Sequence, residues 1–201
     1  PREYFFSLVG VGIALAGGVG DFLWHSIFGI ESGIEALLSP THLVLAVGGA
    51  IATAGPLYAV WYRQKSQPIH VGPTILSTAY FISTITFMLQ FLHPFALPWP
   101  AQTFLAIHSI PFNYGVMLGV ASILTFTVII FGTILSILKH WVFPFGSFAI
   151  ILTINAIAIT LMKGGYYQFI ITAFVAGLLI DIFDSILVRK NMRRMAHIHL
   201  F

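Results

Sequence analysis

Residues 4–27 read YFFSLVGVGIALAGGVGDFLWHSI, and no acidic or basic side chain interrupts this run before Asp21. About 20 consecutive apolar residues in an α-helix cross the ~30 Å hydrocarbon core of a bilayer. Every backbone N–H and C=O group must be satisfied inside that core, and a helix does this within a single segment. The stretch therefore predicts a membrane-spanning helix, and it decides the class of the protein.

The remainder of the 201-residue chain has the same character. Hydrophobic residues make up 58% of it and charged residues only 7%, whereas about 25% of the residues in a soluble domain are charged. This composition excludes a water-soluble fold and predicts one all-α transmembrane domain over residues 1–201. The nine Lys and Arg residues are too few and too scattered for a nucleic-acid-binding surface. The absence of cysteine excludes disulfides and thiolate ligands.

Six apolar runs are long enough to span a membrane, and proline, glycine and polar residues separate them. We expect a six-helix bundle with spans near 4–27, 40–62, 73–93, 113–138, 144–162 and 166–188. Because the number of spans is even, both termini lie on one side. All Lys and Arg residues except Lys163 then share that side, and cytoplasmic loops carry an excess of Lys and Arg. The sequence thus predicts a multi-pass plasma-membrane protein with both termini in the cytoplasm.

Ionisable groups gather between Gly20 and His42, in the stretch GDFLWHSIFGIESGIEALLSPTH. Asp21 and His25 are four residues apart, so they share one face at the outer end of the first helix. The sequence SPTH at 39–42 is typical of a helix start, with Ser39 as the cap and Pro40 in the first turn. This places His42 in the opening turn of the second span, at the same depth as Asp21 and His25.

Other candidate ligands lie at the same outer level. His93 ends the third predicted span, and His108 lies in the connection 94–112 that follows it. The segment between the first two spans predicts a short interfacial helix, with Glu31 and Glu35 on its polar side. We take Asp21, His25, His42 and His93 as the expected metal ligands. Glu31, Glu35 and His108 are candidates for additional ligands or for groups that hydrogen-bond to the ligands.

Imidazole and carboxylate together are the usual ligands of copper, zinc and non-haem iron. Two alternatives remain open. The cluster could be a structural contact, with Asp21 accepting a hydrogen bond from His25. The histidines could instead be axial ligands of a haem in a membrane anchor subunit. The pattern does not decide between an enzyme and a binding protein.

The motif Asp21-x-x-x-His25 followed by Ser39-Pro40-x-His42 resembles the copper site in the C subunit of copper membrane monooxygenases, the methane and ammonia oxidisers. In that family an Asp-x-x-x-His and a later Thr-Pro-x-His supply copper ligands. The resemblance covers residues 21–42, where the histidine spacing is longer here because of an inserted GIE segment. It implies copper rather than zinc, and a place in a redox or monooxygenase-type complex beside other membrane subunits or further copies of the chain. The remaining spans resemble prokaryotic multi-pass membrane proteins, which implies a prokaryotic inner membrane.

Two further acids fall inside the last predicted span, in the sequence LLIDIFDSILVRK. Asp181 and Asp184 share a helix face, and acids within a membrane are candidates for a proton or ion relay. The alternative is that Asp184 pairs with Arg189, Lys139 or His140. Asn155, in the fifth predicted span, could hydrogen-bond Asp181 or join helices. A transporter would be expected to show broken half-helices in matched halves, and the sequence shows no such pair.

Small residues line the first predicted span, where Gly10, Gly12, Gly17, Gly18 and Gly20 recur. Small side chains allow two helix backbones to approach closely in a membrane. We therefore expect this helix to pack tightly against a neighbour.

Overall fold

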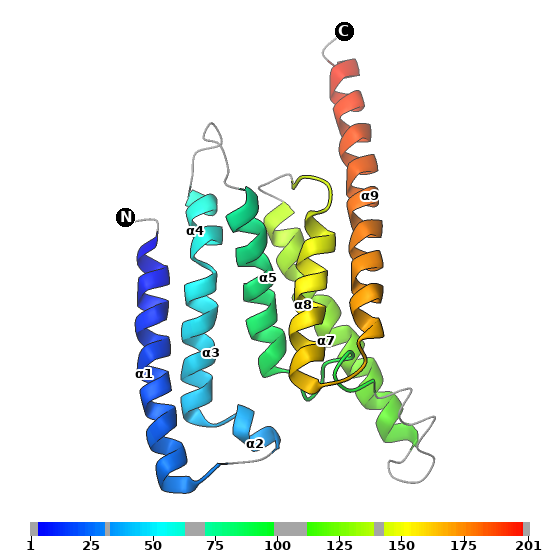
Figure 1. The fold of residues 1–201 in the computed structure, drawn as a ribbon. Coiled ribbons are helices and arrows are strands. Elements are labelled where there is room, and N and C mark those ends of the chain that lie inside the picture. Colours follow the sequence, from blue (N-terminus) through cyan, green and yellow to red (C-terminus); the bar gives the residue numbers. More distant parts are fainter. Residues whose placement is uncertain (1–3, 31–32, 63–70, 99–111, 139–142, 199–201) are drawn as a thin grey trace.

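The computed structural model describes residues 4–30, 33–62, 71–98, 112–138 and 143–198, and all regular secondary structure in these ranges is helical (Figure 1). The helices are α1 (Phe5–Phe28), α2 (Ile34–Leu37), α3 (Pro40–Thr53), α4 (Gly55–Tyr62), α5 (Val71–Met88), α7 (Phe112–Leu138), α8 (Ser147–Lys163) and α9 (Gln168–Ile198). The short α2 lies between the first two long helices, where the sequence predicts an interfacial helix.

Four helices are long and apolar enough to cross a membrane: α1, α5, α7 from Tyr114, and α9 as far as Leu187. The helices α3 and α8 are apolar but shorter. Large apolar side chains stay exposed along α1, among them Leu8, Leu15 and Phe22. Such a surface is stable against lipid rather than water, so the fold is that of a helical membrane protein.

The second predicted span, 40–62, is divided into α3 and α4 around Ala54. Pro56 lies in the first turn of α4 and has no backbone N–H to donate, so the helical hydrogen-bond ladder is interrupted there. Ser77 of α5 donates its hydroxyl to the carbonyl of Thr53, beside the interruption. The third predicted span, 73–93, ends early: α5 stops at Met88, and turns follow over residues 89–98.

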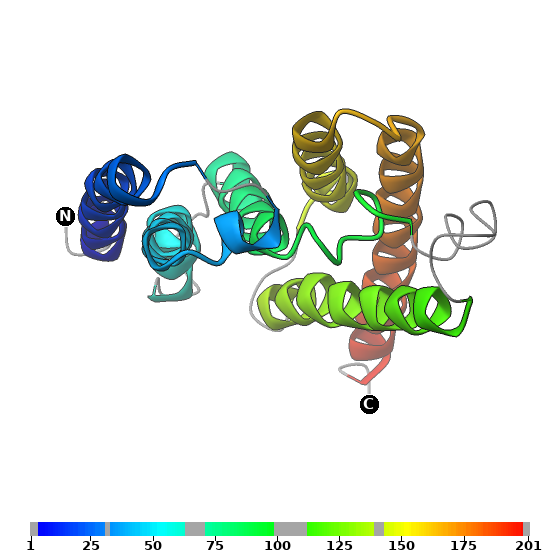
Figure 2. The ribbon, with the colours of Figure 1, turned by 90° about the horizontal axis from the view of Figure 1, so that it is seen from below.

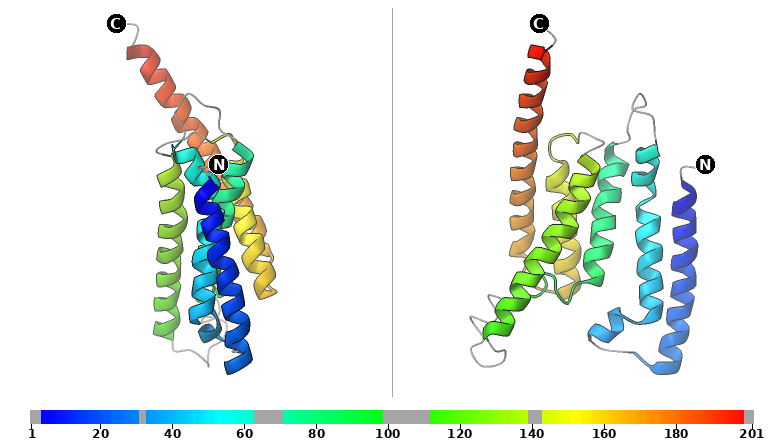
Figure 3. Two further views of the ribbon diagram at one scale, coloured as in Figure 1. Left: turned by 90° about the vertical axis from the view of Figure 1, so that its left-hand side faces the viewer. Right: turned by 180° about the vertical axis from the view of Figure 1, so that it is seen from behind.

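The helices α1, α3, α5, α8 and α9 follow one another in a row, and α7 crosses one side of that row (Figure 2). Figure 3 shows that α1 begins and α9 ends at the same end of the molecule, while α2 lies at the opposite end. The apolar core lies where α7 meets the row, and its buried residues include Ile82, Ile134 and Phe148.

The contact between α1 and α3 depends on glycine. A Cβ added to Gly48 would lie 2.4 Å from the backbone nitrogen of Ala14, and one added to Gly10 would lie 2.3 Å from that of Ala52. Near the far end, a Cβ on Gly17 would lie 2.9 Å from the nitrogen of Leu45. The expected close packing of the first span is therefore confirmed. It aligns the end of α1 with the start of α3.

Candidate metal centre

Three of the predicted ligands meet where α1 ends and α3 begins. Asp21, His25 and His42 each offer one donor atom, and these atoms all lie within 4.8 Å of one another. The Nε2 atom of His25 is 3.5 Å from Oδ2 of Asp21, and Nδ1 of His42 is 3.3 Å from Oδ1 of the same carboxylate. Between 18% and 26% of each side chain is exposed, so the group is partly open to its surroundings.

Local sequence explains how each helix presents its ligands. Helix α1 continues to Phe28, so Asp21 and His25 share one face, as predicted. Ser39 is the N-cap of α3, with Pro40 at the first helical position, and its hydroxyl accepts a hydrogen bond from the backbone nitrogen of His42 at 3.3 Å. The predicted helix start is thus confirmed, and it holds His42 in the first turn.

Each candidate ligand is also held by a group outside the three. The hydroxyl of Thr41 donates to Oδ1 of Asp21 at 2.8 Å, and the hydroxyl of Ser39 lies 2.8 Å from Nδ1 of His42. The Nδ1 atom of His25 lies 3.0 Å from the carbonyl oxygen of Gly29. Partners like those of Asp21 and His25 fix the orientation of metal ligands in metalloproteins. The Ser39 hydroxyl differs, because it contacts the His42 nitrogen that faces Asp21 and must give way before that atom can bind a metal. The role of Thr41 was not predicted from the sequence. The only indication of it was a hydroxyl next to His42 in the first turn of a helix.

The hydrogen bond to the Gly29 carbonyl determines that Nδ1 of the His25 ring carries a hydrogen. A carbonyl oxygen only accepts, so Nδ1 of His25 carries the hydrogen. In the neutral imidazole, Nε2 then presents a lone pair to the Asp21 carboxylate. Two electron-rich atoms at 3.5 Å attract each other only through a proton or a metal cation. The arrangement is therefore compatible with a proton or a metal cation between the two atoms.

The spacing of the donor atoms suits a transition metal. Ligands about 2.05 Å from a tetrahedral metal are separated from one another by roughly 3.3 Å. The carboxylate-to-imidazole separations of 3.3 and 3.5 Å match that value. The remaining separation, between the donor atoms of the two imidazoles, is within 4.8 Å.

His93 is not one of the three residues that meet, so its prediction as a fourth ligand is corrected here. It lies beyond the end of α5, is 1% exposed, and packs its ring 4.3 Å from that of Phe126. Its Nδ1 accepts the backbone N–H of Phe95 at 3.1 Å. Burial lowers the pKa of His93 to about 4, against a smaller opposing contribution from Asn155. The side chain is thus a neutral, packed imidazole.

Several predicted positions lie outside the described residues. Glu31 and His108 are among them, as are Lys139 and His140, which were expected near Asp184. Glu35 falls within the backbone of α2, but its side chain lies outside the described part, as does that of Arg189.

Asp181 holds one helix end in the described structure. Its Oδ1 accepts the backbone N–H of Phe148 at 3.2 Å, and its Oδ2 accepts that of Ala149 at 3.0 Å, so it binds the first turn of α8. Gly177, one turn earlier on α9, allows this approach, because a Cβ there would lie 2.4 Å from Cα of Ala149. The sequence analysis missed this role for Gly177, although the pattern Gly-x-x-x-Asp could have indicated it.

The other two predictions in this region have different outcomes. Asn155 donates to Thr86 at 2.7 Å and to Ser83 at 3.3 Å, so it joins α8 to α5 rather than reaching Asp181. Asp184 is partly exposed and lines a groove between α7 and α9. A relay through Asp181 and Asp184 stays a prediction.

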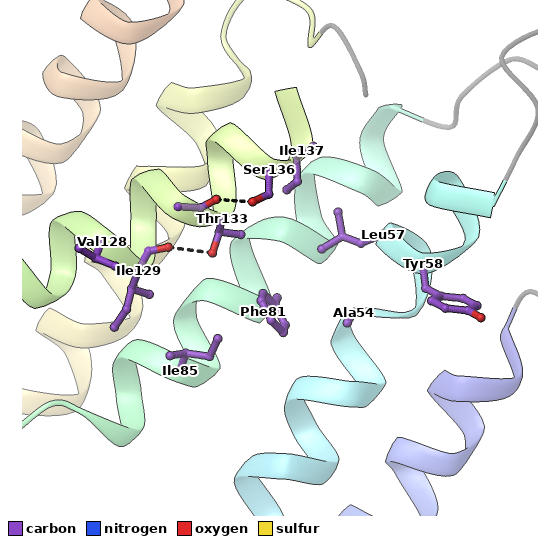
Figure 4. A pocket seen from close by; sticks show the side chains of 11 residues that line it. Ala54, Leu57, Tyr58, Phe81, Ile85, Val128, Ile129, Thr133, Ser136 and Ile137 are labelled. Carbon is purple, nitrogen blue, oxygen red and sulfur yellow. Dashed lines mark hydrogen bonds between the residues drawn. The ribbon is translucent and has the colours of Figure 1, made fainter. Parts of the chain in front are cut away.

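A cavity of about 700 Å³ lies between α4, α5 and α7 (Figure 4). Its walls are mainly apolar, including Leu57, Phe81 and Ile85. The hydroxyls of Thr133 and Ser136 donate to carbonyls of their own helix at 2.8 and 2.7 Å. Both hydroxyls thus already have hydrogen-bond partners, so the cavity presents a surface suited to hydrocarbon.

No family model, curated protein sequence or solved structure matches this chain.

Proposed function

We propose that this chain is an integral membrane protein that binds copper through Asp21, His25 and His42. The observation that carries the proposal is the meeting of two imidazoles and one carboxylate at separations typical of ligands that share a metal. Burying such groups near a membrane is costly unless they are paired or bind an ion. The hydrogen bonds from Thr41 and to Gly29 support the same interpretation, because they orient the donor atoms.

Copper is proposed ahead of zinc and haem for chemical reasons. Imidazole with carboxylate suits Cu(II) and Zn(II) far better than calcium or magnesium, and the resemblance to copper membrane monooxygenases favours copper of the two. Haem is disfavoured because the Asp21 carboxylate lies 3.5 and 3.3 Å from the imidazoles of His25 and His42, where a porphyrin held between these rings would have to lie. The resemblance also supports a role within a redox complex containing other membrane subunits or further copies of the chain.

The proposal includes a topology of six spans in a prokaryotic inner membrane, with both termini in the cytoplasm. In it, α3 and α4 together form the second crossing and α8 the fifth. The segregation of Lys and Arg supports this orientation. With the termini in the cytoplasm, the proposed metal centre lies at the outer face. Because the chain has no native cysteine, single cysteines can test it. A cysteine at position 101 should react with an impermeant reagent from outside, and one at position 67 should not; the reverse pattern would overturn the orientation.

Metal analysis tests the function directly. Gently purified protein should hold stoichiometric copper, with a Cu(II) electron paramagnetic resonance signal showing nitrogen coupling and no Soret band. The variants His42→Ala and Asp21→Ala should each lose most of the metal while keeping their helical content, whereas His70→Ala should keep it. A Soret band would instead support a haem-binding anchor subunit. Zinc found without copper would show that the site binds zinc rather than copper. Full occupancy in both variants, or no metal in the wild type, would make the cluster a structural contact.

A further inference from the structure

A second cavity, separate from the metal centre, opens between α3, α5 and α8. Its volume is about 250 Å³, and its lining residues include Tyr80, Ser83 and Thr86 of α5 with Asn155 and Met162 of α8. Tyr80 is 54% exposed and Met162 is 62% exposed, so these two side chains lie at the mouth. A cavity with this mouth opens sideways from the helix row, toward the lipid that surrounds a membrane protein.

The inner wall of the cavity is polar. Asn155 and Thr86 are 2% and 1% exposed, and the Asn155 amide donates to the hydroxyl oxygens of Thr86 and Ser83. Within the described ranges, the bond from Asn155 is the only hydrogen bond of the Ser83 hydroxyl. Its hydrogen therefore remains available to a molecule in the cavity.

Next to Asn155 lies another buried polar group, the imidazole of His93. Its Nε2 atom is buried, and the interaction with the Asn155 side chain opposes the lowering of the His93 pKa by burial. Its Nδ1 already accepts the Phe95 N–H, so Nε2 carries the hydrogen of the neutral ring and faces the region of the Asn155 amide. Polar groups are costly inside a membrane protein unless they are paired, so a buried polar cluster beside the cavity is in keeping with a binding site.

We propose that the cavity binds a neutral, lipid-soluble molecule that carries a hydroxyl or carbonyl group. The oxygen would accept the Ser83 hydroxyl, and the apolar body would lie between Tyr80 and Met162. None of the described residues that line the cavity is charged, so a charged ligand would lose its hydration without compensation. At roughly 30 Å³ per water-sized group, the volume takes a molecule of about eight heavy atoms, and a mainly apolar cavity with a few polar groups is typical of small-molecule sites.

A photoactivatable alcohol tests this proposal in the full chain reconstituted in liposomes. The probe is hexanol bearing a diazirine, which is close to the size that the cavity takes, and its control is the same molecule with hydrogen in place of the hydroxyl. Mass spectrometry should find the alcohol attached at Tyr80, Met162 and neighbouring lining residues, and excess 1-hexanol should remove that labelling. The hydrocarbon control should label exposed apolar surface without this preference.

Three variants distinguish labelling inside the cavity from labelling of any lipid-exposed surface. Ser83→Ala should reduce the competed labelling about 5-fold, the effect of one lost hydrogen bond. Ala158→Phe fills the cavity from a partly exposed position and should abolish it. Ser136→Ala is the matched control, because that hydroxyl donates to its own helix in the other groove, and it should change nothing. Equal labelling by the hydrocarbon, or labelling that Ala158→Phe leaves intact, would overturn the proposal.

Discussion

The substitution Gly48→Ala tests whether the approach of α1 and α3 builds the metal centre. Its Cβ would lie 2.4 Å from the backbone nitrogen of Ala14 and 2.9 Å from the carbonyl oxygen of Gly10, whereas ordinary contacts begin near 3.4 Å. Both obstructing atoms belong to the backbone of α1, so no side-chain rotation relieves the clash. The helices must separate by about 1 Å, the difference between the clashing and ordinary distances.

That movement is large on the scale of a metal site. Carried along the helices, it would lengthen the 3.3 Å separation between Asp21 and His42 to about 4.3 Å. Two donors about 2.05 Å from one metal are at most about 4.1 Å apart, even on opposite sides of it. His42 would therefore leave the metal, while Asp21 and His25 remain together on α1. Disturbing a group that merely supports a ligand costs 10–100-fold in affinity, so loss of a ligand should cost about 100-fold or more.

The assay is competition for Cu(II) against a chelator of known affinity, with electron paramagnetic resonance reporting the number of nitrogen ligands. Gly12→Ala on the same helix is the matched control, because a Cβ there meets nothing within 4 Å. It should keep full affinity, and the helix should be slightly more stable, since alanine favours helix over glycine by about 1 kcal/mol. A folded Gly48→Ala protein with wild-type affinity and an unchanged nitrogen count would refute the reasoning.

Three shorter predictions address other contacts. Thr41→Val removes the 2.8 Å hydrogen bond to Asp21 and should weaken metal binding about 10-fold in the chelator assay without loss of folding, whereas Thr41→Ser should retain it. Asp181→Asn removes one of two backbone hydrogen-bond acceptors at the start of α8 and should lower the free energy of unfolding by about 1–3 kcal/mol. Its metal content should be unchanged, because this contact lies at the opposite end of the molecule. For His93, the pKa is lowered from 6.5 to about 4 in the folded chain, so the unfolded chain binds the extra proton between these values. Stability should fall as the pH drops from 6.5 to 4, by up to about 3 kcal/mol, and denaturant titrations of His93→Phe should lack this fall.

The sequence was sufficient to predict features that depend only on residues close together in the chain. Asp21 and His25 share a face because they are four residues apart on one continuous helix, and His42 lies in a first turn because Ser39 and Pro40 start that helix. These contacts are set within a few residues of each other, so periodicity and capping rules predict them. The apolar composition likewise predicts the helical membrane class without any knowledge of tertiary contacts.

The sequence did not predict contacts that depend on which helices are neighbours in the fold. Hydropathy places His93 at a depth similar to that of Asp21 but does not say which helices are neighbours. In the structure α3 lies between α1 and α5 in the row, and His93 packs on Phe126 of α7 instead. The contact of Gly177 and Asp181 with the start of α8 was missed for the same reason, because it joins segments about 30 residues apart in sequence.

A structural contact and a metal site make different use of His25. A neutral His25 that served only as a hydrogen-bond partner of Asp21 would direct an N–H toward it. In this chain the hydrogen of the neutral ring is directed to the carbonyl of Gly29, which leaves Nε2 without one at 3.5 Å from the carboxylate. The same carboxylate already accepts the Thr41 hydroxyl and lies 3.3 Å from His42. Donors held by a group behind them, as Asp21 is by Thr41 and His25 by Gly29, are typical of metal ligands, so this geometry supports the proposed metal site over a contact between neutral side chains.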